Sequence, residues 1–224
     1  MIKNKYNHGK EEWQFMKTIY LIRHSMTGVK IENYENFREI PWNEYNTNMI
    51  LSVEGEEKAK KLCDVQELDN IEEIYASGSA RAIATAKYLA DKKNLSIKLD
   101  KRINELEFDI EYYKEMPDDF TKQIFDNKDL KINTYESLNE MDNRFNNFIK
   151  ELLKNDNNNI CIVIHGILLL SYLGSVATEA FDGKSFKITF NGKEILNGTP
   201  SAPDIYKLSF EDNKLIDMER INLV

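Results

Sequence analysis

Four residues that can bind anions lie at or near the ends of predicted elements of the sequence. The run "TIYLIR" ends on Arg23 and is followed by His24, and the run "ICIVI" is followed by His165. Arg81 lies near the start of the alanine-rich segment "SARAIATAKYLADKK". Arginine suits phosphate because its planar guanidinium donates two parallel charge-assisted hydrogen bonds, and a helix N-terminus adds partial positive charge. Two arginines, two histidines and a helix start would form a strong anion site if the fold brings them together.

Strand and helix patterns alternate along the chain, which predicts the elements that must position these side chains. Buried strands are predicted at 18–23, 71–77, 95–100 and 160–166, and two strands around a polar turn at 204–221. Helices are predicted at 51–66, 79–93, 137–154 and 167–178. This alternation indicates a three-layer α/β fold with a mostly parallel central sheet and helices on both faces. Ligands bind beyond the carboxyl ends of strands in such sheets, so the two histidines could meet there.

The helix starts have capping signals. Ser52 is the expected N-cap of its helix, and Ser137 with Glu140 forms a capping-box pattern. Two other stretches, 29–50 and 109–133, are polar and aromatic without clear periodicity. We expect them to be insertions near the mouth of the site, where loops usually set specificity.

Length and composition indicate one domain of a soluble protein. The chain has 224 residues, and we expect a polar N-terminal extension over 1–16 and a single domain over 17–224. The formal net charge of −8 disfavours nucleic acid and anionic membranes as partners. No export signal or membrane span is evident, and Cys63 and Cys161 match no metal or redox spacing, so we expect a cytoplasmic location. The sequence leaves the oligomeric state open.

Five segments in order resemble the motifs of a known family. "LIRHSMTG" resembles the "RHG" signature of the histidine phosphatase superfamily, phosphoglycerate mutase-like branch 1, and "LSVEGEEKAKKL" is similar to its "LT..G..QA" helix. "YASGSARAIATA", "RINELEF" and "VIHG" are similar to its arginine, acid and second-histidine segments. The resemblance implies a phosphoglycerate mutase-like fold.

The resemblance also implies a role for each matching residue. His24 would be the nucleophile that forms a phosphohistidine. Arg23, Arg81 and His165 would hold the phosphoryl oxygens and stabilise their charge during transfer. Glu105 would be the general acid that protonates the leaving oxygen and then the base that activates water. No metal and no cofactor would be needed, and the partner would be a small phosphorylated substrate.

Other positions near the motifs match the family less closely. Ser25 and Asp109 stand where glycine is usual, which the fold can accommodate if the backbone does not need a positive φ there. Lys30 stands where many members have an asparagine that touches phosphate, and it could contact the anion as a point charge. We expect Thr27 and Lys30 to contribute to substrate binding.

Two further functions remain open. The favoured reaction is metal-independent hydrolysis of phosphate monoesters by a histidine phosphatase. A mutase-type phosphoryl transfer is the first alternative, although the insertions are more acidic than basic, as in "MPDDF" and "EYYKE". A non-catalytic phosphate-binding regulatory module is the second. For the acid, Glu107 is the competitor of Glu105, and Glu105 is preferred.

Overall fold

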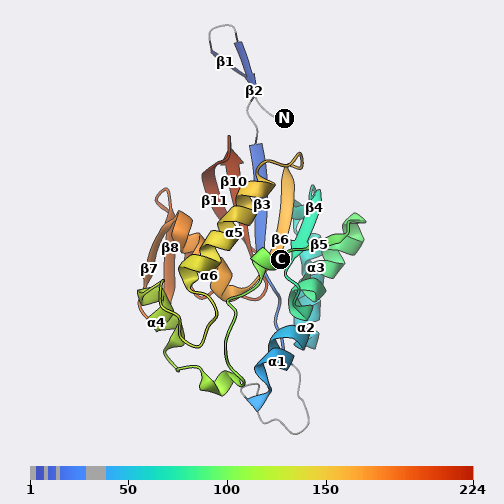
Figure 1. The fold of residues 1–224 in the computed structure, drawn as a ribbon. Coiled ribbons are helices and arrows are strands. Elements are labelled where there is room, and N and C mark those ends of the chain that lie inside the picture. The colour runs from blue at the N-terminus through green and yellow to red at the C-terminus, as the bar shows by residue number, and fades with distance from the viewer. Residues whose placement is uncertain (1–3, 8–9, 14–15, 29–38, 224) are drawn as a thin grey trace.

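The computed structural model of the chain describes residues 4–7, 10–13, 16–28 and 39–223. Its central sheet has six strands in the order β11-β10-β3-β6-β4-β5 (Figure 1). The four strands β3 (Met16–Arg23), β6 (Asn159–Ile164), β4 (Glu73–Ala76) and β5 (Ile97–Leu99) run parallel. The strands β10 (Asp204–Glu211) and β11 (Lys214–Ile221) form an antiparallel hairpin, in which β10 pairs with β3 and β11 is the edge strand. The predicted strands are therefore confirmed, in a mixed sheet with a parallel centre.

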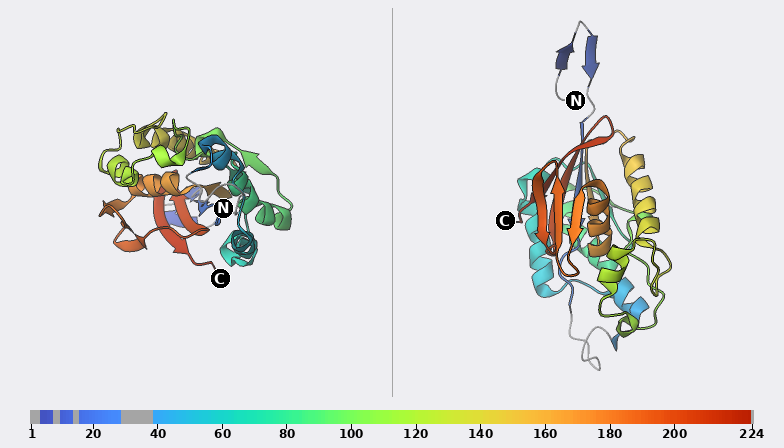
Figure 2. Two further views of the ribbon diagram at one scale, coloured as in Figure 1. Left: turned by 90° about the horizontal axis from the view of Figure 1, so that it is seen from below. Right: turned by 90° about the vertical axis from the view of Figure 1, so that its left-hand side faces the viewer.

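Helices cover both faces of this sheet, as the sequence predicted. Ile19 and Leu21 of β3 belong to the core formed with α5 (Leu138–Leu152) and α6 (Gly166–Val176). Tyr20 and Ile22, which point to the other face, pack with α3 (Ala80–Lys93) and with the turns that follow α2 (Val53–Lys61). Figure 2 shows the sheet between these two helical layers. The result is a three-layer α/β fold.

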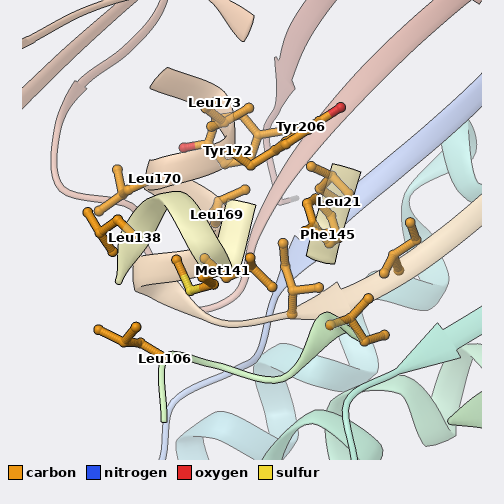
Figure 3. Packing of buried hydrophobic residues seen from close by; sticks show 14 of the residues in the cluster. Leu21, Leu106, Leu138, Met141, Phe145, Leu169, Leu170, Tyr172, Leu173 and Tyr206 are labelled. Atoms are coloured by element: carbon orange, nitrogen blue, oxygen red, sulfur yellow. The ribbon is translucent and has the colours of Figure 1, made fainter. Parts of the chain in front are cut away.

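The larger core lies between the sheet and the pair α5 and α6. Figure 3 shows Met141 and Phe145 of α5 close to Leu169 and Tyr172 of α6, with Leu21 of the sheet beside them. The rings of Phe145 and Tyr172 meet edge to face, with centroids 4.8 Å apart. This packing fixes α6 on the sheet, and α6 begins directly after His165.

The predicted caps are present. The Ser52 hydroxyl accepts a hydrogen bond from the backbone N–H of Gly55. Ser137 and Glu140 form the complete capping box. The α2 helix ends at Lys61, earlier than predicted, and continues as the short 3-10 turns η2 (Leu62–Asp64) and η3 (Gln66–Leu68).

Several elements were not predicted from the sequence. The stretches 29–50 and 109–133 contain the short helices α1 (Trp42–Asn48) and α4 (Phe120–Asp126). The second stretch also contains the 3-10 turn η5 (Tyr113–Glu115), and the 3-10 turn η4 (Lys101–Ile103) precedes it. The strands β7 (Thr178–Phe181), β8 (Phe186–Phe190) and β9 (Lys193–Gly198) form a separate antiparallel sheet. Near the N-terminus, β1 (Asn4–Asn7) and β2 (Lys10–Trp13) pair with each other. Across the described ranges, no helix has the length and apolar character needed to cross a membrane.

Candidate active site

The site lies at the carboxyl ends of three neighbouring parallel strands, β3, β6 and β4. Arg23 pairs with Ile164 in the sheet register, and the His24 backbone N–H continues the ladder to the Ile164 carbonyl at 2.8 Å. His24 and His165 therefore leave adjacent strands side by side, with ring centroids 5.2 Å apart. The sequence predicted that these rings could meet, and the register of the two strands brings them together.

Arg81 lies between the two histidines. It belongs to the first turn of α3, which starts beyond β4, and its side chain is buried. Its Nε donates to His24 Nε2 at 3.3 Å, and its Nη2 donates to His165 Nδ1 at 3.2 Å. These two N–H groups form one edge of the guanidinium, the fork that elsewhere grips a carboxylate or phosphate. Three of the four residues predicted to bind the anion thus form one hydrogen-bonded cluster.

The hydrogen bonds of His24 define which ring nitrogen can react. Nδ1 lies 2.8 Å from the carbonyl oxygen of Ser25, which can only accept, so Nδ1 carries the proton. Nε2 then keeps its lone pair and faces Arg81. Burial, followed by the charge of Arg81, lowers the pKa of His24 to about 3. At neutral pH the ring is an uncharged imidazole whose free lone pair lies on Nε2, as a nucleophile requires.

His165 has the opposite tautomer. Because Arg81 can only donate, Nδ1 of His165 is an acceptor and Nε2 carries the proton. Nε2 lies 2.6 Å from the hydroxyl of Ser77, a fully buried residue at the end of β4. Burial, with the nearby charge of Arg81, lowers the pKa of His165 well below its ordinary value. Both ring nitrogens already have protein partners, so His165 here orients Arg81.

Arg23 is held against the start of α6. Its Nη1 donates to the carbonyls of Pro200 and Ser201 in the loop before β10. Its Nε is buried and has no hydrogen-bond partner among the described residues. A Cβ on Gly166 would lie 3.3 Å from that Nε, so the glycine of "VIHG" allows the guanidinium to lie flat against the helix start. A buried N–H without an acceptor is costly, which makes Nε a donor for an incoming anion.

Glu105 caps the start of α6 from the other side. Its two carboxylate oxygens accept hydrogen bonds from the backbone N–H groups of Ile167 and Leu168, both at 2.9 Å. These residues follow His165 directly, so the carboxylate lies beside the histidine pair.

The positions where the sequence departs from the family pattern are accommodated. Neither Ser25 nor Asp109 is among the residues with positive φ. The Ser25 backbone N–H donates to Thr85 Oγ1 at 2.8 Å, and its hydroxyl donates to the Gly55 carbonyl at 2.7 Å. A Cβ on Gly55 would come within 2.0 Å of the Met26 carbonyl oxygen, so α2 requires glycine to approach the loop that carries His24. Ser25 thus ties the loop that carries His24 to both α2 and α3.

The remaining predicted binding residues lie at the edge of the cluster. Thr27 is half-buried and forms an isolated backbone bridge with Leu51. Among the described residues, no side-chain hydrogen bond joins it to His24 or Arg81, so its role in substrate binding stays a prediction. Lys30 lies outside the described residues.

A cavity of about 680 Å³ opens beside the cluster. Its lining includes Arg81, His165 and Glu105, together with Asn46 and Thr47 of α1 and parts of the segments 77–79 and 99–107. The volume falls within the range of small-molecule sites, so a phosphate ester with a sizeable leaving group fits. Within the described ranges there is no cluster of three or more histidine, cysteine or acidic residues arranged to hold a metal ion.

Three residues that contact the histidine and arginine cluster, or the loop that carries His24, were not predicted from the sequence. Ser77 and Thr85 lie in the segment "YASGSARAIATA", whose match to the family could have drawn attention to their hydroxyls. Asn46 accepts hydrogen bonds from Arg81 at both its backbone carbonyl and its side-chain oxygen. It lies in a stretch with no periodic signal, so only its general placement near the mouth was predictable.

Known proteins of one family resemble this chain. A profile of the histidine phosphatase superfamily (branch 1) matches residues 19–191. Phosphoserine phosphatase 1 of Hydrogenobacter thermophilus is 27% identical over 121 residues, which span 51% of this chain and 57% of that protein.

Solved structures show the same fold. A mycobacterial glucosyl-3-phosphoglycerate phosphatase has a TM-score of 0.62 and 15% identity, covering 92% of this chain and 97% of the other. Phosphoglycerate mutase from Bacillus anthracis has a TM-score of 0.59 and 19% identity, with 93% of each chain covered. The phosphoglycerate mutase-like fold predicted from the motifs is therefore confirmed.

Proposed function

The chain belongs to the histidine phosphatase superfamily (branch 1), and on that premise we propose that it hydrolyses phosphate monoesters through a phosphohistidine on His24. The observation that carries this proposal is the hydrogen bond from His24 Nδ1 to the Ser25 carbonyl at 2.8 Å. It leaves the Nε2 lone pair facing the arginine fork, where a phosphoryl group would bind. The low pKa of about 3 keeps that lone pair free of a proton at neutral pH.

In the first step the Nε2 lone pair of His24 attacks phosphorus, and the bond from phosphorus to the ester oxygen breaks. Glu105 gives its proton to that leaving oxygen, so the alcohol departs neutral. In the second step Glu105 takes a proton from water, whose oxygen attacks phosphorus while the bond to Nε2 breaks. Inorganic phosphate leaves and His24 is restored.

Three groups would stabilise the charge on the transferring phosphoryl oxygens. The Arg81 edge that bridges the two histidines would donate its N–H groups to the phosphoryl oxygens. The buried Nε of Arg23, which has no partner among the described residues, would supply a further donor. His165 would accept from Arg81 in the resting state and remain next to the phosphoryl group during transfer.

The direct test is phosphate release from an aryl phosphate such as p-nitrophenyl phosphate. We expect turnover by the wild-type protein and a loss of several orders of magnitude in His24→Ala. Equal rates in the two proteins would remove His24 from the mechanism. No turnover by the wild type, with phosphate still bound, would favour the non-catalytic binding module.

A mutase is the alternative reaction, because one structural neighbour is a phosphoglycerate mutase. A mutase returns the phosphoryl group to its substrate, whereas a phosphatase releases it to water. Incubation with 3-phosphoglycerate separates the two reactions. We expect inorganic phosphate or no reaction, and an isomer formed without phosphate would contradict the proposal.

We propose a small phosphorylated metabolite as the substrate and the cytoplasm as the location. The relative in Hydrogenobacter thermophilus is named a phosphoserine phosphatase, so phosphoserine belongs in the first substrate screen. Both cysteines, Cys63 and Cys161, are free thiols, which fits a reducing compartment.

A further inference from the structure

The guanidinium of Arg81 forms hydrogen bonds along two of its edges with different parts of the chain. Its Nε and Nη2 bridge the two histidines on one edge. On the other edge, Nη1 donates to the Asn46 backbone carbonyl at 2.5 Å and Nη2 donates to Asn46 Oδ1 at 2.9 Å. A single residue thus holds the edge that faces away from the nucleophile. Because arginine only donates, the side-chain atom that it meets must be the amide oxygen.

Asn46 is itself held independently of Arg81. It lies one helical turn after Trp42 in α1, so the two side chains share a face of the helix. Trp42 is buried, packs edge to face on Phe108 at 4.8 Å, and donates its backbone N–H to the carbonyl of Glu111. Asn46 is therefore anchored to the segment that follows Glu105.

We infer that Asn46 is a positioning residue, which holds Arg81 so that its Nε and Nη2 edge points at the phosphoryl group on His24. This inference rests on the proposed function and extends it to a residue outside the sequence motifs. A guanidinium on a long flexible side chain can turn about its last bonds, and burial alone does not select which edge faces the histidines. The two oxygens of Asn46 select it, and the phosphoryl group then meets a preorganised fork.

The arrangement also connects substrate binding to chemistry. Asn46 and Thr47 line the cavity that would receive the leaving group, on the same short helix that grips Arg81. A leaving group in this cavity would therefore contact the helix that also holds the arginine edge needed at the phosphoryl group.

The test compares Asn46→Ala and Asn46→Asp with the wild type. Asn43→Ala is the matched control, because Asn43 has the same side chain, lies in the same helix and is exposed. The readouts are kcat and KM for p-nitrophenyl phosphate and the Kd of inorganic phosphate by calorimetry, with thermal unfolding to check that each variant is folded. We expect Asn46→Ala to lower kcat by about ten- to a hundredfold and to weaken phosphate binding, since a charge-assisted hydrogen bond is lost. Asn46→Asp keeps an acceptor oxygen and should recover most of the lost kcat, while Asn43→Ala should match the wild type.

Two results would overturn the inference. One is an Asn46→Ala protein with the kcat and phosphate affinity of Asn43→Ala, and the other is an Asn46→Asp protein as slow as Asn46→Ala. If the wild type does not hydrolyse the ester, the proposed function fails and phosphate binding alone decides. Weaker binding in Asn46→Ala than in Asn43→Ala then supports the positioning role, whereas equal binding, or no binding by the wild type, overturns it.

Discussion

His24 and His165 carry their ring protons on opposite nitrogens, although both follow a strand of the same sheet. The difference comes from their partners: a carbonyl that only accepts faces Nδ1 of His24, and an arginine that only donates faces Nδ1 of His165. The proton positions thus follow from two neighbouring groups. They leave the lone pair of His24 on Nε2, next to the arginine.

This assignment can be read directly by nitrogen NMR of the imidazole rings, because the chain has three histidines. We expect His24 to show the Nδ1–H tautomer and His165 the Nε2–H tautomer in the phosphate-free protein. Neither ring should titrate between pH 8 and pH 5, because burial and Arg81 lower both pKa values, that of His24 to about 3. A titration near pH 6.5 in either ring would contradict the account, and His24→Ala and His165→Ala provide the assignments.

Ser77 is the partner that completes the histidine pair. Its hydroxyl faces Nε2 of His165 at 2.6 Å in a fully buried position. We expect Ser77→Ala to leave that N–H without an acceptor, to shift the Nε2 resonance of His165 while Arg81 maintains its tautomer, and to lower kcat by about tenfold. The same NMR experiment checks the tautomer. An unchanged His165 spectrum, in a protein that still loses activity, would rule out this explanation.

Glu105 and Glu107 are neighbouring carboxylates, and the proposed acid and base role belongs to Glu105 alone. Glu105 binds the start of α6, whereas Glu107 is exposed on the cavity wall. We expect Glu105→Gln to lower kcat by about 10²- to 10⁴-fold, and Glu107→Gln to change it far less. Single-turnover kinetics measure this effect. In Glu105→Gln, the rate of the first step should fall less for an aryl phosphate with a good leaving group. The reverse order of effects would transfer the role to Glu107.

At the scale of elements, the capping box of α5 can be tested as a source of stability. The backbone N–H of Glu140 donates to Ser137 Oγ, and the backbone N–H of Ser137 donates to the Glu140 carboxylate. Ser137→Ala should cost about 1 kcal/mol of the free energy of unfolding, because the cap is lost in a buried position. Urea denaturation measures it, with Ser185→Ala, an exposed serine in the turn between β7 and β8, as the control. Equal midpoints for the two variants would show that the box contributes nothing.

The elements that could be predicted were those with a strong local signal. The run "ICIVI" and the face of "SLNEMDNRFNNFIKELLK" predicted β6 and α5, because burial against a sheet imposes continuous or helical apolar periodicity. In α1 only Trp42 is buried within the helix, so seven residues gave no period to detect. Its position depends on contacts with Phe108, far along the chain.

The site was predictable to a similar degree. The strand ends placed His24 and His165, and the motif order placed Arg81. The tautomers, the orientation of Arg23 towards Pro200 and the capping of α6 by Glu105 depend on tertiary contacts. No local pattern of residues encodes such contacts, so they required the folded chain.

At the scale of the whole molecule, the buried titratable groups couple folding to pH. In the unfolded chain His24 and His165 bind protons below about pH 6.5, whereas in the folded chain their pKa values are depressed. The unfolded state therefore binds more protons below that pH, and stability falls as the pH falls. Buried Asp142 acts oppositely, because burial raises its pKa to about 6 and the folded state takes up its proton first.

Between pH 6.5 and pH 5, the unfolded state is expected to bind two protons, on His24 and His165, that the folded state does not bind. The folded state is expected to bind one proton, on Asp142, that the unfolded state does not bind. The free energy of unfolding should fall by about 1.4 kcal/mol per pH unit in that window. Urea denaturation at several pH values measures the slope. Asp142→Asn should steepen it towards two protons, and a stability that stays flat or rises as the pH falls to 5 would contradict the burial of the two histidines.

Trapping the phosphohistidine on His24 tests the proposed mechanism most directly. The protein is mixed with a ³²P-labelled phosphate monoester, quenched within milliseconds, and assayed for protein-bound phosphate that is stable in alkali and labile in acid. We predict label on the wild type, more label on Glu105→Gln because its hydrolysis is slowed, and none on His24→Ala. Turnover by the wild type without any such label, or label that survives in His24→Ala, would contradict the account.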